Sequence, residues 1–393
     1  MLNRMKILNI SPAISALWNF GGAVLTSVEL AKALLHQGHR VFYLATNARR
    51  NSSRRLPASQ DFTWEGMPVR LCKMWGPKPP FYSPELRTRV RLYAPDYDIA
   101  LIRSCWTYVG PAAARECRRA RLPYLAYAEG SLNPFALRQG RWKKEIWWRL
   151  GERAYFQGAA AIVAITEDER RHMRAAGLTN RIEVIPNGIN LGDLEPAMSR
   201  TELEAGWSRL KDRSWLLFLG RLHPLKGLDL LLRAFALVAG KYPDHLLVIA
   251  GPDEGGYRKV LEKMVLNLGL ESRVFFPGPV YGAAKAGLLK ESEFLALTSY
   301  SDVFGLSVHE ALACGTPVLV TTTCHIPHVA QAGAGLVVEP EVEPVSRGME
   351  ELLGDDRMRR EMGANGPRLI ASRFTWEKVA RQTAALCAEV MGR

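Results

Sequence analysis

Short apolar runs alternate with amphipathic stretches along the whole chain. In the first half, the runs expected to form strands are 5–11, 39–46, 98–104, 123–129, 161–167 and 182–187. The series restarts after residue 210, with runs 214–222, 245–251, 273–279, 294–299, 316–322 and 334–339. Such runs are typical of parallel strands covered on both faces, and the stretches between them suit right-handed crossover helices. The pattern predicts an α/β fold with two doubly wound Rossmann-like domains facing across a cleft.

The domain boundary is expected in the polar segment 190–206, which contains Pro196. This gives an N-terminal domain of residues 1–195 and a C-terminal domain of residues 196–376. At the N-terminus, basic residues precede a short apolar run, as in a signal peptide. Polar residues and a proline interrupt that run, which favours a first strand instead.

Charge differs sharply between the two halves. Residues 1–200 contain 30 Lys and Arg against 16 Asp and Glu, for a net charge of +14, whereas residues 201–393 contain 22 and 23, for −1. An anionic partner is therefore expected for the first half only, and nucleic acid and an anionic membrane surface are both candidates. The six cysteines have no paired or metal-type spacing, which is typical of reduced cytosolic thiols.

Two cations follow the first strand of the second half. The strand is expected to end at Gly220, and Arg221 and Lys226 come before a helix that begins near Gly227. Open α/β sheets bind ligands at the carboxyl ends of their strands, where two cations can neutralise a diphosphate. The alternative is a solvated Arg and Lys in a loop.

In a second segment, a glycine lies between two acidic residues, Asp302 and Glu310. A predicted helix begins directly after this glycine. The glycine allows close backbone approach, and the amides at the helix start favour an anion. Glu310, one turn further in, needs a hydrogen-bonding partner, which ribose hydroxyls would supply; a structural salt bridge is the alternative. The residues that form this helix opening are Phe304, Gly305, Leu306 and Ser307.

Several motifs, in this order and spacing, resemble one family. They are PNGIN at 186–190, GRLHPLKG at 220–227, GPDEGG at 251–256, FPGPV at 276–280 and DVFGLSVHE at 302–310. The chain resembles the retaining glycosyltransferases of the GT-B fold, in particular family 4, the group 1 glycosyl transferases. The stretch 21–41 also resembles the family's glycine loop and first helix, so the resemblance covers essentially the whole chain.

The resemblance implies roles for these residues. Arg221 and Lys226 would bind the donor diphosphate and stabilise the leaving group, Glu310 would bind the ribose, and Asp302 would contact the transferred sugar. Gly251 and Val280 would lie at the base pocket. Gly21 and Gly22 would form the wall of the N-terminal domain facing the diphosphate. The final helix, 377–393, would belong to the N-terminal domain.

Two positions depart from the family pattern. Asp302 stands where the family usually has Glu. We expect the shorter side chain to change which hydroxyl of the transferred sugar the carboxylate contacts. Glu129 stands where a His is common, and a carboxylate cannot donate as an imidazole can. Glu129 is expected to contact the donor sugar, stabilise positive charge at the anomeric carbon or accept the acceptor's proton; the alternative is a simple pair with a nearby Arg.

The reaction is expected to need no metal and no cofactor. No Asp, His and Cys residues are spaced to hold a divalent ion, and His325 and His328 near Cys324 are a weak candidate. Cations and helix amides would stabilise the charge on the departing diphosphate. The family implies retention of anomeric configuration by front-face attack within an ion pair.

The acceptor should explain the basic first half. In 137–150, Trp142, Ile146 and Leu150 share a helical face among cations, which suits a helix at the headgroup level of an anionic membrane; a core-facing helix is the alternative. Further cations are Arg49, Arg50, Arg54, Arg55, Arg115, Arg118, Arg119 and Arg121. We expect a nucleoside-diphosphate hexose donor and a lipid-linked or saccharide acceptor in polysaccharide or glycoconjugate biosynthesis. The enzyme would be cytoplasmic and peripheral to the inner face of the membrane.

Three rival functions remain. A sugar phosphorylase or a nucleotide-sugar epimerase would use the same scaffold. A nucleic-acid-binding protein is suggested by charge alone, without a recognisable recognition element, and no nucleic-acid partner is expected. A dinucleotide-dependent dehydrogenase is disfavoured because no G-x-G-x-x-G turn follows the first strand.

Overall fold

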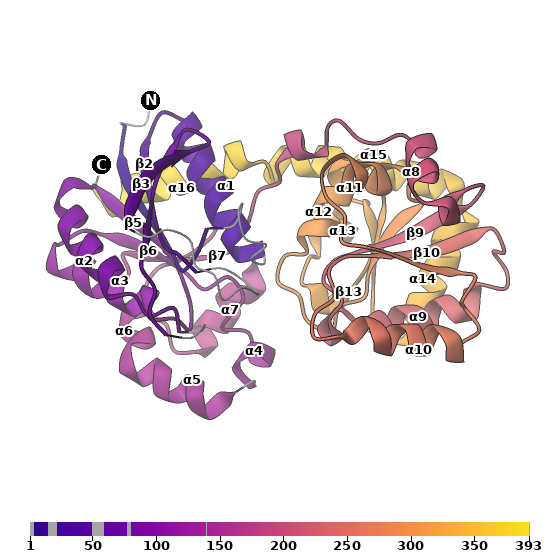
Figure 1. The fold of residues 1–393 in the computed structure, drawn as a ribbon, viewed down its shortest axis with the longest axis horizontal. Helices are drawn as coiled ribbons and strands as arrows, with labels where there is room; N and C mark the ends of the chain where they lie inside the picture. The colour runs from indigo at the N-terminus through magenta and orange to yellow at the C-terminus, as the bar shows by residue number, and fades with distance from the viewer. Residues whose placement is uncertain (1–3, 15–21, 49–58, 77–79, 139, 393) are drawn as a thin grey trace. The chain divides into compact units, whose positions relative to one another are not determined.

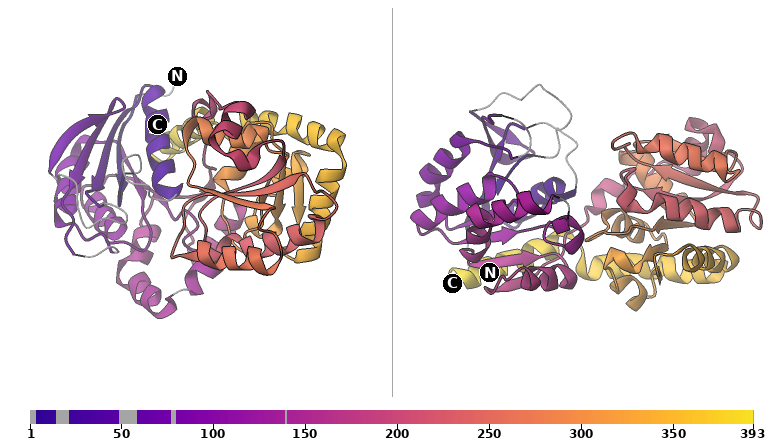
Figure 2. Two further views of the ribbon diagram at one scale, coloured as in Figure 1. Left: turned by 45° about the vertical axis from the view of Figure 1, so that its right-hand side comes forward. Right: turned by 90° about the horizontal axis from the view of Figure 1, so that it is seen from below.

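The computed structural model describes residues 4–14, 22–48, 59–76, 80–138 and 140–392. The chain forms two compact units: unit 1 is Met1–Gly188 with Trp376–Arg393, and unit 2 is Ile189–Thr375 (Figures 1 and 2). The division falls earlier than the expected 195/196 boundary because Ile189 already forms a β-bridge with Thr375 of unit 2. Each expected apolar run contains a strand, as the fold prediction requires.

Unit 1 contains an eight-stranded sheet of order β3-β4-β2-β1-β5-β6-β7-β8. Its strands are β1 Lys6–Ser11, β2 Arg40–Thr46, β3 Gln60–Trp64, β4 Met67–Cys72, β5 Ile99–Arg103, β6 Tyr124–Tyr127, β7 Ala161–Ala164 and β8 Ile182–Val184. All pairs are parallel except β3–β4. The strand order reverses between β1 and β5, which is where doubly wound sheets bind ligands.

The β3–β4 hairpin was not expected from the sequence. Its two-residue turn has Glu65 at φ 47° and Gly66 at φ 78°, as the twist of a tight hairpin requires. Strand β3 lies at the edge of the sheet and alternates between exposed and partly buried residues, so it leaves no continuous apolar run.

Helices cover both faces of this sheet (Figure 1). Successive strand residues face opposite sides, so Ile7 belongs to the core beneath α1 and α16 and Leu8 to the core beneath α2 and α3. The helices of unit 1 are α1 Gly22–His36, α2 Pro84–Tyr93, α3 Val109–Arg119, α4 Pro134–Arg138, α5 Arg141–Trp147, α6 Arg153–Gln157, α7 Glu167–Ala175 and α16 Trp376–Val390. Helix α16 packs against α1, and Gln37 donates a hydrogen bond to the carbonyl of Glu377 at 2.7 Å.

Unit 2 contains a fully parallel six-stranded sheet of order β11-β10-β9-β12-β13-β14. Its strands are β9 Ser214–Leu219, β10 His245–Ala250, β11 Val274–Gly278, β12 Phe294–Leu297, β13 Val318–Thr321 and β14 Gly335–Val338. Its helices are α8 Arg200–Gly206, α9 Leu228–Val238, α10 Tyr257–Asn267, α11 Gly282–Glu291, α12 Leu306–Ala313, α13 His328–Gln331, α14 Val342–Gly354 and α15 Asp356–Arg373. The order reverses between β9 and β12, so the loops after these two strands meet at the switch point.

All six cysteines are free thiols, and four of them are buried. Within the described ranges, no helix combines the length and the apolar character needed to span a bilayer.

Candidate active site

The loops that follow β9 and β12 are joined at the switch point of unit 2. Gly227 has φ 62°, and a Cβ atom there would lie 2.0 Å from the carbonyl oxygen of Thr298. The Thr298 hydroxyl donates to the Gly227 carbonyl at 2.9 Å, and the amide of Tyr300 donates to the Leu225 carbonyl at 2.9 Å. Glycine is therefore required here so that the two loops can touch.

Lys226 and Asp302 form an ion pair across these loops. The ammonium of Lys226 lies 2.5 Å from Oδ2 of Asp302, and the two side chains are 19% and 15% exposed. Burial opposes ionisation of Asp302, but Lys226 and the backbone N–H groups of Val303 and Gly305 outweigh burial and lower the pKa of this carboxyl. Lys226 is thus not a solvated loop cation, and Asp302 carries a negative charge at neutral pH.

Helix α12 opens directly beyond this pair. Gly305 adopts the left-handed conformation, with φ 63°, and precedes Leu306, the first helical residue. Leu306 and Ser307 occupy the first turn, whose N–H groups have no partners within a helix and carry the positive end of its dipole. The four residues expected to form an anion-binding helix opening are in that arrangement, with Phe304 buried behind it.

An aromatic cluster supports the helix opening from behind. His309 stacks on Phe304 at 4.0 Å between ring centroids, and its Nδ1 lies 3.1 Å from the Gly305 carbonyl oxygen. Nε2 of His309 lies 3.0 Å from Nε2 of His328, which packs against Phe374. Burial lowers the pKa of His309 to about 3 and that of His328 to about 4, so both imidazoles are neutral at pH 7 and one donates to the other.

Arg221 lies on the side of β9 next to β10. It forms an ion pair with Glu254, from the loop after β10. Gly251 begins that loop with φ 147°, and a Cβ atom there would lie 1.8 Å from the carbonyl oxygen of Gly220. Gly251 therefore accommodates the neighbouring backbone. Val280 follows β11 and is 8% exposed.

Glu310 has a protein partner in this structure. Lys285 of α11 donates to Oε1 of Glu310 at 2.9 Å, and both side chains are about one-fifth exposed. The salt bridge weighed as the alternative is therefore present. It uses one carboxylate oxygen.

Glu129 of unit 1 is paired with an arginine, the alternative considered for it. It follows β6 at φ 50°, and its Oε1 accepts from Nε of Arg103, the last residue of β5, at 2.7 Å. Arg103 is 3% exposed; it also donates to the Thr26 hydroxyl at 3.0 Å and lies 4.5 Å from the centre of the Tyr127 ring. Burial raises the pKa of Glu129, and Arg103 offsets only part of that effect.

Two further buried carboxylates support the loops around Glu129. Glu169 accepts hydrogen bonds from the amides of Gly130 and Ile165, at 2.5 and 2.7 Å. Glu152 accepts from the amide of Trp106 at 3.0 Å and from the indole of Trp147 at 3.1 Å. Burial raises the pKa of Glu152 and of Glu169 to about 7, so each is partly protonated at neutral pH.

The remaining expected residues are placed as follows. Gly22 opens α1, after β1, whereas Gly21 and the cations Arg49, Arg50, Arg54 and Arg55 lie outside the described residues. No three His, Cys, Asp or Glu side chains cluster in a way that would hold a metal ion in the part of the chain that the structure describes.

Helix α5 is a surface helix. None of its residues is buried, but the Trp147 indole donates to buried Glu152, and Trp148 directly after the helix packs against the core, so one side of this segment faces the protein, as the alternative holds. Trp142, Ile146 and Leu150 are 67%, 50% and 77% exposed. Of the basic set on α3, however, Arg118 and Arg119 are held by internal partners, the Ala154 carbonyl and Glu116.

Comparison with known families accounts for both units. The model of the family "Glycosyl transferases group 1" matches residues 199–369, and that of the "Glycosyl transferase 4-like domain" matches residues 21–188. The chain belongs to the group 1 glycosyl transferases. The switch-point residues described above, from Arg221 to Glu310, all lie within the first of these matches.

Curated relatives and solved structures agree with this assignment. The D-inositol 3-phosphate glycosyltransferase of Rhodococcus erythropolis is 29% identical over 330 residues, covering 80% of this chain and 71% of the relative. The protein of the same name from Kineococcus radiotolerans is 31% identical over 253 residues, covering 60% of this chain and 58% of the relative. Anabaena HepE, crystallised with UDP and glucose, superposes with a TM-score of 0.78 at 20% identity, over 98% of this chain and 100% of HepE. Sucrose-phosphate synthase of Thermosynechococcus elongatus gives 0.76 at 20%, over 99% and 100%. The fold of this group 1 glycosyl transferase is therefore GT-B.

Three side chains of these sites, Arg103, Lys285 and His309, escaped the sequence analysis, and His328 was considered there only as a weak metal candidate. Arg103 and Lys285 are single cations within apolar segments, far along the chain from the carboxylates that they contact. His309 and His328 are joined only by the folding of α13 against α12. Only Arg103 left a signal, as a charged residue at the end of an expected strand.

Proposed function

We propose that this group 1 glycosyl transferase transfers a hexose-type sugar from a nucleoside diphosphate to an acceptor, with retention of anomeric configuration and without a metal ion. The observation that carries the proposal is the Lys226–Asp302 pair immediately before the left-handed Gly305 that opens α12. A cation, a carboxylate that can accept hydrogen bonds from sugar hydroxyls and a helix N-terminus lie together at one switch point. This is the combination that a sugar diphosphate requires.

The donor diphosphate would lie against Lys226, Arg221 and the first-turn amides of α12. Breaking the bond between sugar and diphosphate builds negative charge on the departing phosphate, and preorganised donors stabilise that charge most. These two cations would supply the charge that a metal ion supplies in other transferases, which supports metal independence. Asp302, oriented by Lys226, would accept hydrogen bonds from the transferred sugar.

The donor nucleoside would lie along the rest of the switch point. Glu310 holds Lys285 through Oε1, and a ribose hydroxyl would donate to Oε2. The base would lie near Gly251 and Val280, and Gly21 and Gly22 would flank the diphosphate from unit 1. Support for a nucleotide-sugar donor comes from Anabaena HepE, which resembles the chain in fold and was crystallised with UDP and glucose.

Retention is proposed from the resemblance to family 4. The leaving diphosphate would stay beside the face that the acceptor attacks, so no protein nucleophile is required. Glu129 would stabilise positive charge near the anomeric carbon or accept the acceptor's proton. Its burial beside Arg103 holds the carboxylate in one position for either role.

The acceptor is proposed to be a lipid-linked or saccharide intermediate of polysaccharide or glycoconjugate synthesis. The exposed Trp142 and Ile146 lie on α5 together with exposed Arg141 and Lys143, and exposed Leu150 lies in the π-helical turn that follows α5. An apolar ridge among cations suits attachment to an anionic membrane surface. We therefore place the protein in the cytoplasm, peripheral to the inner face of the membrane.

A donor screen tests the proposal. The full chain is incubated with UDP-, GDP- and ADP-hexoses and a panel of lipid-linked and saccharide acceptors in the presence of EDTA, and nucleoside diphosphate release is measured. We expect release from one class of donor without added phosphate, and NMR of the product should show the donor's anomeric configuration. Inverted product refutes retention, and loss of activity in EDTA refutes metal independence. A requirement for free phosphate would indicate a phosphorylase, and isomerisation of the donor without an acceptor would indicate an epimerase.

A further inference from the structure

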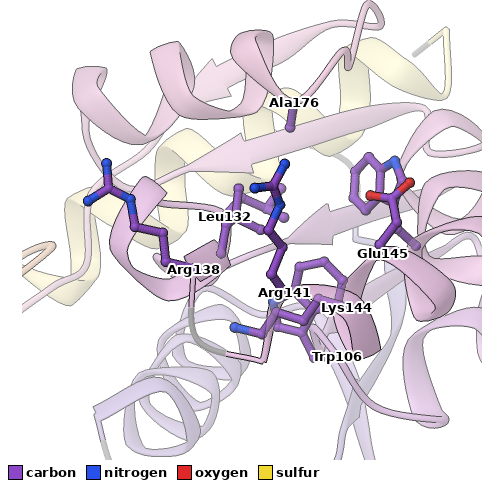
Figure 3. A pocket seen from close by; sticks show the side chains of 9 residues that line it. Trp106, Leu132, Arg138, Arg141, Lys144, Glu145 and Ala176 are labelled. Atoms are coloured by element: carbon purple, nitrogen blue, oxygen red, sulfur yellow. The ribbon is translucent and has the colours of Figure 1, made fainter.

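Unit 1 contains a pocket that the proposed donor chemistry does not use. Its volume is about 390 Å³, and it lies between α5 and the loop after β6 (Figure 3). Three cations line it, Arg138, Arg141 and Lys144, together with the indoles of Trp106 and Trp148. Figure 3 shows the two arginine side chains on either side of Leu132, with Lys144 and Trp106 below them.

Two of the three cations of this pocket are available to a ligand. Within the described ranges, neither Arg138 nor Arg141 has a hydrogen-bond or ion-pair partner, and both are exposed. Lys144 is already committed, because its ammonium donates to the Ala136 carbonyl and lies 5.5 Å from the centre of the Trp106 ring, and burial lowers its pKa. The carboxylate that lines the pocket, Glu145, is held by Arg149 at 2.8 Å. The pocket therefore has an uncompensated positive charge.

A second pocket, near the end of α5, shows how cations are committed to the protein. Its volume is about 370 Å³, and three arginines line it, Arg87, Arg115 and Arg118, of which two have internal partners. Arg87 is paired with Glu116 at 2.7 Å, and Arg118 donates to the Ala154 carbonyl at 2.9 Å. Those two cations hold the protein together, whereas Arg138 and Arg141 do not.

The first pocket is built on the backbone that carries Glu129. The Trp106 indole donates to the Ser131 carbonyl at 2.9 Å, and buried Leu132 forms part of the wall. The amide of Gly130, between them and Glu129, is held by Glu169. The pocket wall and Glu129, the carboxylate proposed to act at the anomeric carbon, therefore belong to the same stretch of four consecutive residues, 129–132.

We propose that this pocket binds the phosphoryl group of the acceptor, so that the acceptor is a phosphate or diphosphate ester. Guanidinium groups match the geometry and the charge of phosphate oxygens. The two indoles offer apolar faces to the ring or chain that the phosphate carries. The inference rests on the proposed function, because it names the acceptor class for that transfer.

Phosphate could reach this pocket on a soluble ester or on a lipid headgroup, and two binding arms separate these sources. One arm titrates the full chain with D-inositol 3-phosphate, with D-inositol as the control without phosphate. The other arm measures sedimentation with phosphatidylcholine vesicles containing phosphatidic acid, with pure phosphatidylcholine as the control. Both arms use a Lys226→Ala background, so that phosphate binding at the donor site does not contribute.

The variant Arg138→Gln/Arg141→Gln is compared with Arg153→Gln, which removes an exposed cation of α6 that lines neither pocket. We expect the double variant to lose about ten- to hundredfold in affinity in at least one arm, as charged hydrogen bonds predict, and Arg153→Gln to stay within about twofold. Loss in the soluble arm or in the lipid arm supports the pocket and identifies the source of the phosphate. Equal binding by both variants, or no phosphate-dependent binding in either arm, overturns the inference.

Donor-site binding, measured by titration calorimetry with UDP, GDP and ADP in the Lys226-containing protein, is scored separately. If wild-type protein binds none of these nucleotides, the proposed function fails whatever the pocket binds. If one nucleotide binds and phosphate binding at the pocket is absent, only the acceptor inference fails.

Discussion

The two units carry their charges in different ways. At the switch point of unit 2, cations are paired with acids: Lys226 with Asp302, and Arg221 with Glu254. On α4 and α5 of unit 1, Arg138 and Arg141 lie exposed and have no partner among the described residues. Paired charges are fixed in position, which suits one small ligand bound in one orientation, whereas unpaired cations create a field that attracts a larger anionic partner.

Buried ionisable groups differ in the same way. Unit 1 buries the carboxyl groups of Glu152 and Glu169 against backbone amides, and unit 2 buries the imidazoles of His309 and His328 against each other. Each set holds a loop beside a proposed site, but one set gains protons on folding and the other loses them. Substitutions and changes of pH should therefore affect the two units differently.

The largest effect is expected for Lys226→Ala. Removing one preorganised donor to the leaving group should lower kcat by about 10²- to 10³-fold, because its charge acts mostly in the transition state. Lys241→Ala is the control, since Lys241 is an exposed cation of the same unit, paired with Glu350. Steady-state donor turnover measures both, and a kcat within about threefold of wild type for Lys226→Ala would remove the proposed role.

Arg103→Met should destabilise unit 1. It leaves Glu129 buried without its partner, which costs about 2–4 kcal/mol of unfolding free energy. Urea unfolding is monitored by hydrogen exchange. The amides of β5 and β6 in unit 1 should lose protection at lower urea, while those of β9 and β12 remain protected. Adding Glu129→Gln should restore much of the stability; no recovery would mean that packing, not the ion pair, explains the loss.

The stabilities of the two units should respond to pH in opposite directions. The pKa of Glu152 and Glu169 is raised to about 7, so the folded state keeps protons that the unfolded chain has released; unit 1 should lose stability as the pH rises from about 4.5 to 7. The pKa of His309 and His328 is lowered to about 3 and about 4, so the unfolded chain takes up protons first; unit 2 should lose stability as the pH falls from about 6.5 to 4. Each group contributes on the order of 1–3 kcal/mol.

Hydrogen exchange, corrected for intrinsic rates, separates the two slopes between about pH 4.5 and 6.5. Glu152→Gln should flatten the slope of unit 1 and leave that of unit 2 unchanged. Parallel slopes in the two units would contradict the account.

The smallest effect on the fold is expected for Trp142→Ser with Leu150→Ser. Both side chains are exposed, so stability should change by less than about 0.5 kcal/mol. Sedimentation with anionic vesicles should show an affinity lower by about tenfold or more, because the apolar contact with the bilayer is lost. Unchanged vesicle binding would assign membrane attachment to another surface.

Some features of the molecule could be predicted from the sequence because they are local. Parallel strands buried on both faces produce continuous apolar runs, and Gly305 before the apolar start of α12 marks a left-handed entry to a helix. The β3–β4 hairpin could not be predicted, because an exposed edge strand produces no such run.

The partners within the site were beyond reach for another reason. Arg103 meets Glu129, and Lys285 meets Glu310, only after the order of strands and helices has been fixed. The close approach of Gly251 to the carbonyl of Gly220 was likewise not predicted. Spacing along the chain identifies which residues matter, but not what each one contacts.

The central claim is that a diphosphate binds at the switch point of unit 2. Titration calorimetry with UDP, GDP and ADP tests it most directly. We predict one site for one of these nucleotides, a loss of affinity of about tenfold or more in Lys226→Ala, and no change in Arg138→Gln/Arg141→Gln. Equal affinity in wild type and Lys226→Ala, or loss in the unit 1 variant alone, would contradict the account.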